Sequence, residues 1–257
     1  MNPSAVLDLF ALLSLGAALG FMGGLFGIGG GIIVIPLLVL AFGMDQALAQ
    51  GTALVMMVPN LMIAWYRYSQ REPVALRVAL QIGALASLTT WAVAHVATQL
   101  NPNAMRIVFS VFLLVLSLRM LAQQRSSLPL KVGRALPQRY MPLVGVVGGG
   151  SMGLLGVGGG LLATPLLTGW FGQRQTVAQS LSLALVAPSS CIALLTYGNA
   201  HSVDWSMGLP LAFGGLFTVS AGVAVAHRLP ERRMRMAFAA MVLCTAVWLL
   251  VRPLFLH

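Results

Sequence analysis

The chain repeats itself at a constant spacing of 129 residues. Residues 24–38 read GLFGIGGGIIVIPLL, and residues 153–167 read GLLGVGGGLLATPLL. The alignment needs no gap, and 20 of the 49 positions from 20 to 68 are identical to their counterparts, whereas so skewed a composition would give roughly four or five by chance. The chain is therefore built from two related halves.

Composition predicts that both halves lie in a lipid bilayer. Of the 257 residues, 58% are apolar and 8% are charged, against about a quarter charged in soluble domains. Basic loops that orient helices account for the net charge of +10, so we expect the bilayer as a partner and no nucleic acid. Apolar runs long enough to cross about 30 Å of hydrocarbon cover residues 47–66, 76–98, 104–122, 177–196, 206–226 and 236–252.

The basic residues indicate that the halves have opposite orientations. Arg67, Arg71 and Arg77 predict a cytoplasmic loop, whereas the equivalent loop 197–205 has no Lys or Arg and is expected outside. Equivalent loops on opposite sides define an inverted-topology repeat. The predicted parts are a first repeat at 4–122, a basic cytoplasmic linker at 123–139 and a second repeat at 140–253, with both termini of the chain outside.

Two glycine-rich segments, 4–43 and 140–172, are longer than a single span. Each is predicted to end on the side where it starts, and therefore to form a hairpin. The second arms, 32–42 and 161–171, have about 11 residues, or roughly 16 Å of helix, which favours a broken or re-entrant hairpin. We therefore expect an all-α polytopic membrane protein with about 8–10 transmembrane segments.

The glycines form two groups. Those spaced four residues apart are expected to pack helices closely. The triple glycines cost about 1 kcal/mol each in a helix and add no packing ridge. They lack the lysine of a nucleotide-binding loop, and the backbone N–H groups that follow are suited to hold an anion. The packing group is Gly16, Gly20, Gly24, Gly145, Gly149 and Gly153, and the binding group is Gly29, Gly30, Gly31, Gly158, Gly159 and Gly160.

Two prolines, Pro59 and Pro188, interrupt equivalent helices near their middles. A proline inside a helix removes one N–H and frees the carbonyl four residues earlier, at Val55 or Ala184. Their duplication makes both candidate hinges.

Polar side chains share a helix face with each proline. Helical spacing aligns Gln50 with Asn60 in the first half, and Gln179 with Ser189 in the second, where Ser190 follows. Neutral amides and hydroxyls at lipid depth need an interhelical partner or a wet cavity, and both interpretations stay open. The glutamines nearest the helix starts are expected at the membrane interface, namely Gln46 and Gln175.

Several kinds of site are missing from the predicted spans. No Asp, Glu or Lys lies in the middle of a span, which disfavours a carboxylate-driven pump or an acidic channel ring. No catalytic set is visible, so no enzyme is expected, and Cys191 and Cys244 indicate neither a metal nor a cofactor. His95 lies near the outer end of its span, where we expect an interfacial residue, with a proton-sensing group as the alternative.

The doubled pattern G-x-G-G-G-x-x-x-x-P, at 27–36 and 156–165, resembles the sulfite exporter TauE/SafE family, also called the toluene sulfonate uptake permease family. The resemblance covers about residues 6 to 252. It implies a bacterial or archaeal inner-membrane permease for sulfur-containing anions, with the glycine hairpins and proline-containing helices around the substrate. Ser180 and Leu181 stand where the first half has Gly51 and Thr52, so the site is expected to be asymmetric.

The prediction is therefore a secondary transporter that moves a small sulfur oxyanion by alternating access between two inverted halves. Most of the candidate groups can donate hydrogen bonds, which suits an anion better than a cation. A transporter of another small anion, a neutral metabolite or a metal ion is the alternative, and a membrane-embedded enzyme follows. A homo-oligomer is compatible with this sequence.

Overall fold

The computed structural model describes residues 3–26, 30–71, 74–125, 136–157 and 159–226, together with 240, 242–243 and 247–248. Every element in these ranges is helical, as the all-α prediction requires. Most of the predicted span 236–252, linker residues 126–135 and the candidates Gly29 and Gly158 lie outside the described residues. The helices are α1 (Pro3–Phe26), α2 (Gly31–Ala41), α3 (Gln46–Arg71), α4 (Leu76–Ala97), α5 (Pro102–Arg125), α6 (Leu143–Leu155), α7 (Gly159–Phe171), α8 (Gln175–Asn199) and α9 (Trp205–Ala226), with a 3₁₀ turn at Gln138–Tyr140.

The sequence repeat is also a repeat of helices. The bounds of α4 and α9 differ by 129 residues at both ends, and so do the starts of α3 and α8. The short second arms predicted from the sequence are present as α2, with 11 residues, and α7, with 13. Both are followed by a glycine with positive φ, Gly43 and Gly172, which is the usual left-handed end of a helix.

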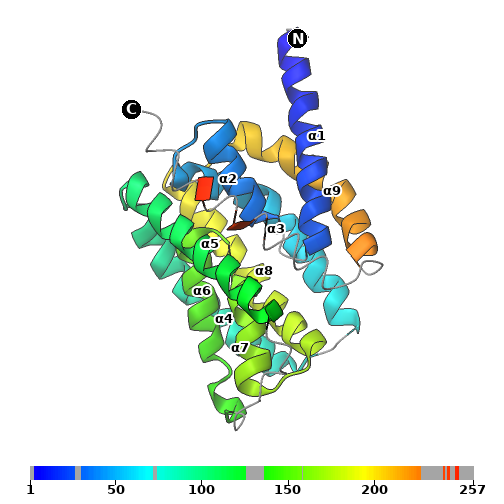
Figure 1. Ribbon diagram of the computed structural model, residues 1–257, viewed down its shortest axis with the longest axis vertical. Coiled ribbons are helices and arrows are strands. Elements are labelled where there is room, and N and C mark those ends of the chain that lie inside the picture. The colour runs from blue at the N-terminus through cyan, green and yellow to red at the C-terminus, as the bar shows by residue number, and fades with distance from the viewer. Residues whose placement is uncertain are drawn as a thin grey trace.

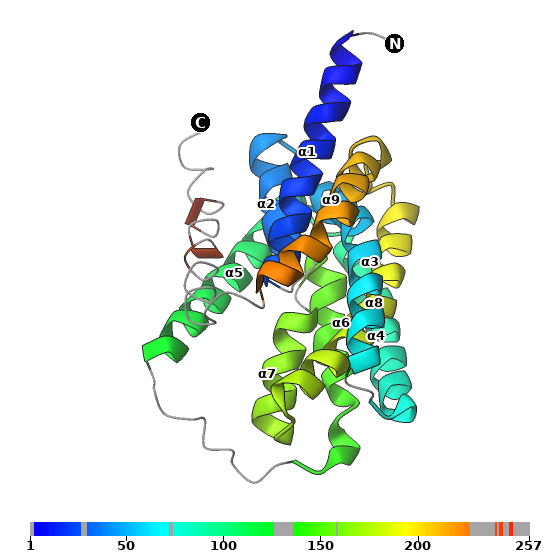
Figure 2. The ribbon, with the colours of Figure 1, turned by 90° about the vertical axis from the view of Figure 1, so that its right-hand side faces the viewer.

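Each half packs against the other through its glycine stripe. Helix α1 lies along α9, and α6 lies along α4 (Figures 1 and 2). A Cβ added to a stripe glycine would collide with the backbone of the partner helix, so the predicted packing role of these glycines is confirmed. Gly16, Gly20 and Gly24 meet Leu211, Gly215 and Val219, whereas Gly145, Gly149 and Gly153 meet Ile82, Ala86 and Thr90, the equivalents 129 residues earlier.

Helices α3 and α8, which contain Pro59 and Pro188, pack together and run in opposite directions. The Tyr197 hydroxyl donates to Gln50 Oε1 at 2.8 Å, which shows that the start of α3 lies beside the end of α8. The loop after α8 also reaches the start of α3, where the Asp204 N–H donates to Thr52 Oγ1 at 2.9 Å. Helix α7 packs on α8 as α2 packs on α3. These four helices form the centre of the fold.

Besides an apolar core, the protein buries several polar side chains and exposes many large apolar ones, which is unusual for a soluble protein. Leu80 on α4 and Phe217 on α9 are 62% and 79% exposed, whereas Gln50 on α3 is fully buried. Extended apolar faces of this kind suit contact with lipid. Three helices among the described residues are long and apolar enough to cross a membrane, Gln46–Gln70, Leu76–Ala97 and Thr176–Asn199, and each corresponds to a predicted span.

Candidate functional site

The glycine motifs break the helices and bring the two halves together. Helix α1 ends before the first motif and α2 begins at Gly31, and α6 and α7 flank the second motif in the same way. Gly30 and Gly156 have φ values of 86° and 65°, which glycine adopts without steric cost. A Cβ on Gly31 would lie 3.0 Å from Val157 Cγ2, so the first break touches the second.

The start of each short helix lies directly after a glycine break. The first N–H groups of an α-helix have no acceptor within the helix, and they carry partial positive charge. Gly31 and Gly159, the first residues of α2 and α7, are buried. Both helix starts are therefore suited to an anion that enters the protein interior.

The second half holds the side chain of Gln50. The Tyr197 hydroxyl lies 2.8 Å from Gln50 Oε1 and 3.1 Å from the Gly153 carbonyl oxygen at the end of α6. Gln50 and Tyr197 are both fully buried. A Cβ on Gly156 would lie only 3.1 Å from Gln50 Cβ, so the glycine makes room for the amide. Gln50 Nε2 has no partner.

Two more amides on α3 are buried without partners. Gln46 and Asn60 are each 2% exposed, and neither the amide oxygen nor the amide nitrogen of either residue makes a hydrogen bond within the described part of the chain. Gln46 is thus buried within the protein, and its depth at the membrane interface stays a prediction. An unpaired buried amide costs about 1–3 kcal/mol, so such groups are retained where water or a ligand supplies the partner.

The hydroxyls of α8 behave differently from the amides of α3. Ser189 Oγ donates to the Val186 carbonyl at 3.1 Å, and Ser190 Oγ donates to the Ala187 carbonyl at 2.8 Å. Both hydroxyl protons are donated within α8, so the two oxygens can only accept hydrogen bonds from a ligand. Gln179 is partly exposed. These residues therefore differ between the halves, with amide donors that have no partner among the described residues in the first half and locally bonded hydroxyls in the second. That the substrate site is asymmetric stays a prediction.

Both proline-containing helices continue through their prolines. The carbonyl freed by Pro188 belongs to Ala184. A Cβ on Gly83 of α4 would lie 3.0 Å from this oxygen and 3.4 Å from Pro188 Cγ. Helix α4 therefore covers the freed carbonyl. The hinge roles of Pro59 and Pro188 stay predictions.

The predicted site residues do not gather at one point. Gln179 and Tyr197 are 18 residues apart on α8, which is about 27 Å of helix. Because Tyr197 contacts Gln50, Gln50 and Gln179 lie near opposite ends of the α3–α8 pair, farther apart than one small oxyanion can bridge. The remaining candidates lie between these ends along the pair and are named the central group by that position, namely Gly30, Gly31, Asn60, Gly159, Gly160, Ser189 and Ser190. The Nδ2 of Asn60 lies beside Gly215 of α9.

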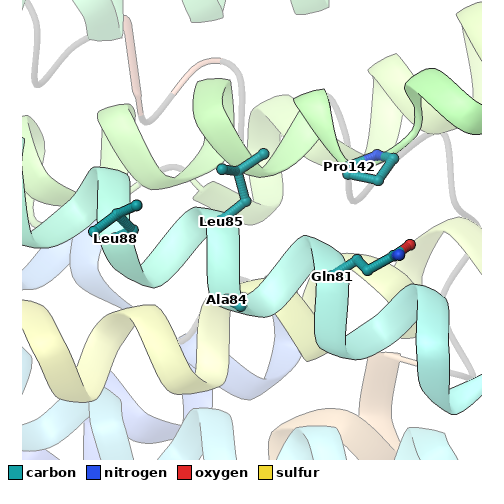
Figure 3. A pocket seen from close by; sticks show the side chains of 5 residues that line it. All are labelled: Gln81, Ala84, Leu85, Leu88 and Pro142. Carbon is teal, nitrogen blue, oxygen red and sulfur yellow. The ribbon is translucent and has the colours of Figure 1, made fainter.

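His95 and an open groove lie away from these buried groups. His95 is exposed near the end of α4 and stacks on Trp91, with 6.3 Å between ring centroids, as expected of an interfacial residue. The groove, of about 400 Å³, lies between α4 and the start of α6. Figure 3 shows Gln81 and Leu85 on α4 and Pro142 on the facing segment. This part of α4 carries exposed leucines, so the groove opens toward the expected lipid.

Sequence reasoning left two residues out of the site, Tyr197 and Gln46. Tyr197 recurs as Tyr68 at the repeat spacing, so its duplication was a signal that could have marked Tyr197 as a candidate site residue. Tyrosine is also common at the membrane interface near the end of a membrane helix. The duplicated position alone therefore does not distinguish a site residue from an interfacial one. Gln46 begins its helix, and nothing in the sequence shows that the loop after α8 lies beside it.

Comparison with known proteins covers nearly the whole chain. A family model described as "Sulfite exporter TauE/SafE" matches residues 12–249. A probable membrane transporter protein of Xylella fastidiosa (strain Temecula1 / ATCC 700964) is 23% identical over 252 residues, covering 95% of this chain and 96% of the relative. The probable membrane transporter protein YunE of Bacillus subtilis (strain 168) is 23% identical over 268 residues, covering 95% and 98%. No solved structure matches the chain.

Proposed function

This chain belongs to the sulfite exporter TauE/SafE family, and from that premise we propose that it moves small sulfur-containing oxyanions, such as sulfite or organosulfonates, across the cytoplasmic membrane. The family and the names of the relatives identify it as a membrane transporter. The proposed mode is secondary transport by alternating access between the two halves.

The observation that supports an anion is the set of unpartnered amides on α3. Gln46, Gln50 and Asn60 together leave three amide nitrogens without acceptors in the interior. Among the described residues no buried side chain is charged, so neutral donors would balance the substrate. The same residues include no group of three His, Cys, Asp or Glu that could hold a metal ion. The metal-ion alternative therefore has no observation in its favour.

The proposed substrate site is the central group. The starts of α2 and α7 would supply backbone N–H groups, Asn60 would supply a side-chain donor, and Ser189 and Ser190 would line the second half. Gly29 and Gly158, which lie outside the described residues, complete the two motifs. Neutral donors would suit a transporter because they bind an oxyanion less tightly than a buried cation does, so the anion can be released.

The packing of the two halves supports the inverted repeat that alternating access requires. Helices α3 and α8 are equivalent in sequence and antiparallel. The α1–α9 contact becomes the α6–α4 contact when the halves are exchanged. In this proposal the Gln50 end faces the outside, the Gln179 end faces the cytoplasm, and Pro59 and Pro188 act as hinges. Both chain termini are then outside and the linker is cytoplasmic.

Single cysteines test this orientation. With Cys191 and Cys244 replaced by alanine, Glu72→Cys should react with a membrane-impermeant maleimide only from the cytoplasm, and His201→Cys only from outside. Intact cells and inverted vesicles provide the two directions. Labelling of both positions from one side would rule out the inverted repeat.

Charge movement in proteoliposomes on solid-supported membranes tests the substrate class. Sulfite, thiosulfate, small sulfonates, sulfate, carboxylates and chloride are applied with and without a pH gradient. A saturable response to sulfur oxyanions is expected, and protein-free liposomes are the control. Silence toward all anions, with no counterflow of labelled sulfite either, would reject the proposal.

A further inference from the structure

The unpaired amides at the start of α3 are separated from the central group. Gln50 precedes Asn60 by ten residues, about 15 Å along the helix. Gln46 lies one turn before Gln50 on the same face. These two glutamines hold three of the five unpartnered buried amide atoms found among the described residues. The central site leaves them unexplained.

We propose that Gln46 and Gln50 form a second binding site for a small oxyanion, here called the outer station, between the outside and the central site. This inference rests on the proposed function, because it assigns the anion and the orientation from that proposal. A nearly dry site increases the strength of each hydrogen bond to a charged ligand. Both glutamines meet this condition, with 2% and 0% exposure.

Tyr197 is the positioning residue of the outer station. A glutamine amide can present either its oxygen or its nitrogen to a ligand. The single proton of Tyr197 has two acceptors in range, Gln50 Oε1 at 2.8 Å and the Gly153 carbonyl oxygen at 3.1 Å. In this proposal the proton goes to the nearer acceptor, Gln50 Oε1, which leaves Nε2 as the free donor. An oxyanion needs donors, so this orientation favours it.

The charged groups nearest the outer station limit its affinity. Asp45 directly precedes Gln46 and is exposed to solvent. Asp204 lies on the loop that binds Thr52, and its carboxylate accepts from Ser206 Oγ at 2.6 Å and from the Met207 N–H at 3.1 Å. Both are negative, so the outer station should bind weakly and release its anion readily.

Transport measured from each face of the membrane tests the outer station. Right-side-out and inside-out vesicles take up ³⁵S-labelled sulfite in oxygen-free buffer. Gln50→Leu and Tyr197→Phe should each raise the half-saturation concentration from the outer face about tenfold, and from the inner face less than twofold. If Tyr197 acts through Gln50, the double variant should be no worse than Gln50→Leu alone.

The repeat supplies matched controls at the other end of the α3–α8 pair. Gln179→Leu and Tyr68→Phe should leave the outer-face value within twofold of the wild type. Gln50→Glu keeps an acceptor for Tyr197 but removes the N–H donor, so it should reproduce the outer-face loss if the leucine variant fails to fold. Equal effects from both faces, or additive losses in the double variant, would overturn the outer station. Wild-type vesicles that take up no sulfur oxyanion in either orientation, sulfonates included, would instead reject the proposed function, and the station with it.

Discussion

The two ends of the α3–α8 pair carry the same residues in different states. At one end Gln50 and Tyr197 are fully buried and bonded to each other. At the other end their equivalents, Gln179 and Tyr68, are partly exposed. Helix α6 packs against α7 and α8 as well as α4, whereas its equivalent α1 packs on α9 and makes few contacts with α2. The Gln50 end of the pair is therefore more closely packed than the Gln179 end.

The charges at the two ends differ as well. The residue before α3 is Asp45, and the equivalent residue before α8 is Arg174; both are exposed. In the proposed orientation, an anion that approaches from the cytoplasm would meet a positive group, and one that leaves to the outside would pass a negative group. The repeat therefore sets the positions of the polar groups, whereas single substitutions such as Asp45 against Arg174 make the two ends different in charge.

The largest expected effect comes from removing the close packing of α6 behind the Gln50 end. A Cβ at Gly149 would collide with the Ala86 backbone, whereas a Cβ on the next residue, Gly150, would meet only Thr89 Cγ2 at 3.9 Å. Gly149→Ala should therefore lower stability by roughly 1–3 kcal/mol, and Gly150→Ala should leave it unchanged or slightly higher. Thermal unfolding in detergent, followed by size-exclusion chromatography, measures both. Equal stability of the two variants would contradict this packing.

A smaller effect is expected from loosening the Gln50 end itself. In a protein without native cysteines, Ala53→Cys is buried one turn inside Gln50. Adding Tyr197→Phe removes the hydrogen bond between the halves, so the thiol should react about ten times faster with an impermeant reagent applied from outside. Tyr68→Phe serves as the control and should leave that rate unchanged. A rate that rises equally in both variants would mean that the ends are not independent gates.

The smallest effect concerns the exposed charges. Asp45→Asn should lower the half-saturation concentration from the outer face, and Arg174→Gln should raise it from the inner face, each by about two- to fivefold at low salt, because exposed charges interact weakly. Uptake measured at about 0.01 M and 1 M salt should show the difference disappear at the higher value. Effects that persist at high salt would indicate direct contact with the substrate.

Much of the helix pattern could be predicted because it depends on local chemistry. The glycine motifs end α1 and α6, and the short arms appear as α2 and α7, since glycine is unfavourable inside helices. Clustering alone does not break a helix, because Gly148, Gly149 and Gly150 lie inside α6. The partner of each stripe was not predictable in the same way. A row such as Gly16 and Gly20 requires a close neighbour but does not identify α9 as that neighbour.

The separation of Gln50 from Gln179 also had no signature in the sequence. In two antiparallel helices related by a two-fold axis, equivalent residues lie close together only near that axis. Pro59 and Pro188 lie near that axis, because Gln50 is paired with Tyr197, the equivalent of Tyr68. Each further turn moves equivalent residues apart. A duplicated pair can thus mark either one shared site or two separate ends, and only the packing distinguishes them.

The glycine stripe of α1 has a consequence for how the protein is made. Gly16 packs against Leu211, which the ribosome adds about 195 residues later, or roughly 10 to 40 s later at usual rates of synthesis. During that time α1 sits in the bilayer without its main partner, and α4 must likewise wait for α6. The first half therefore cannot mature as a domain on its own, and the bundle closes only when the second half has been inserted.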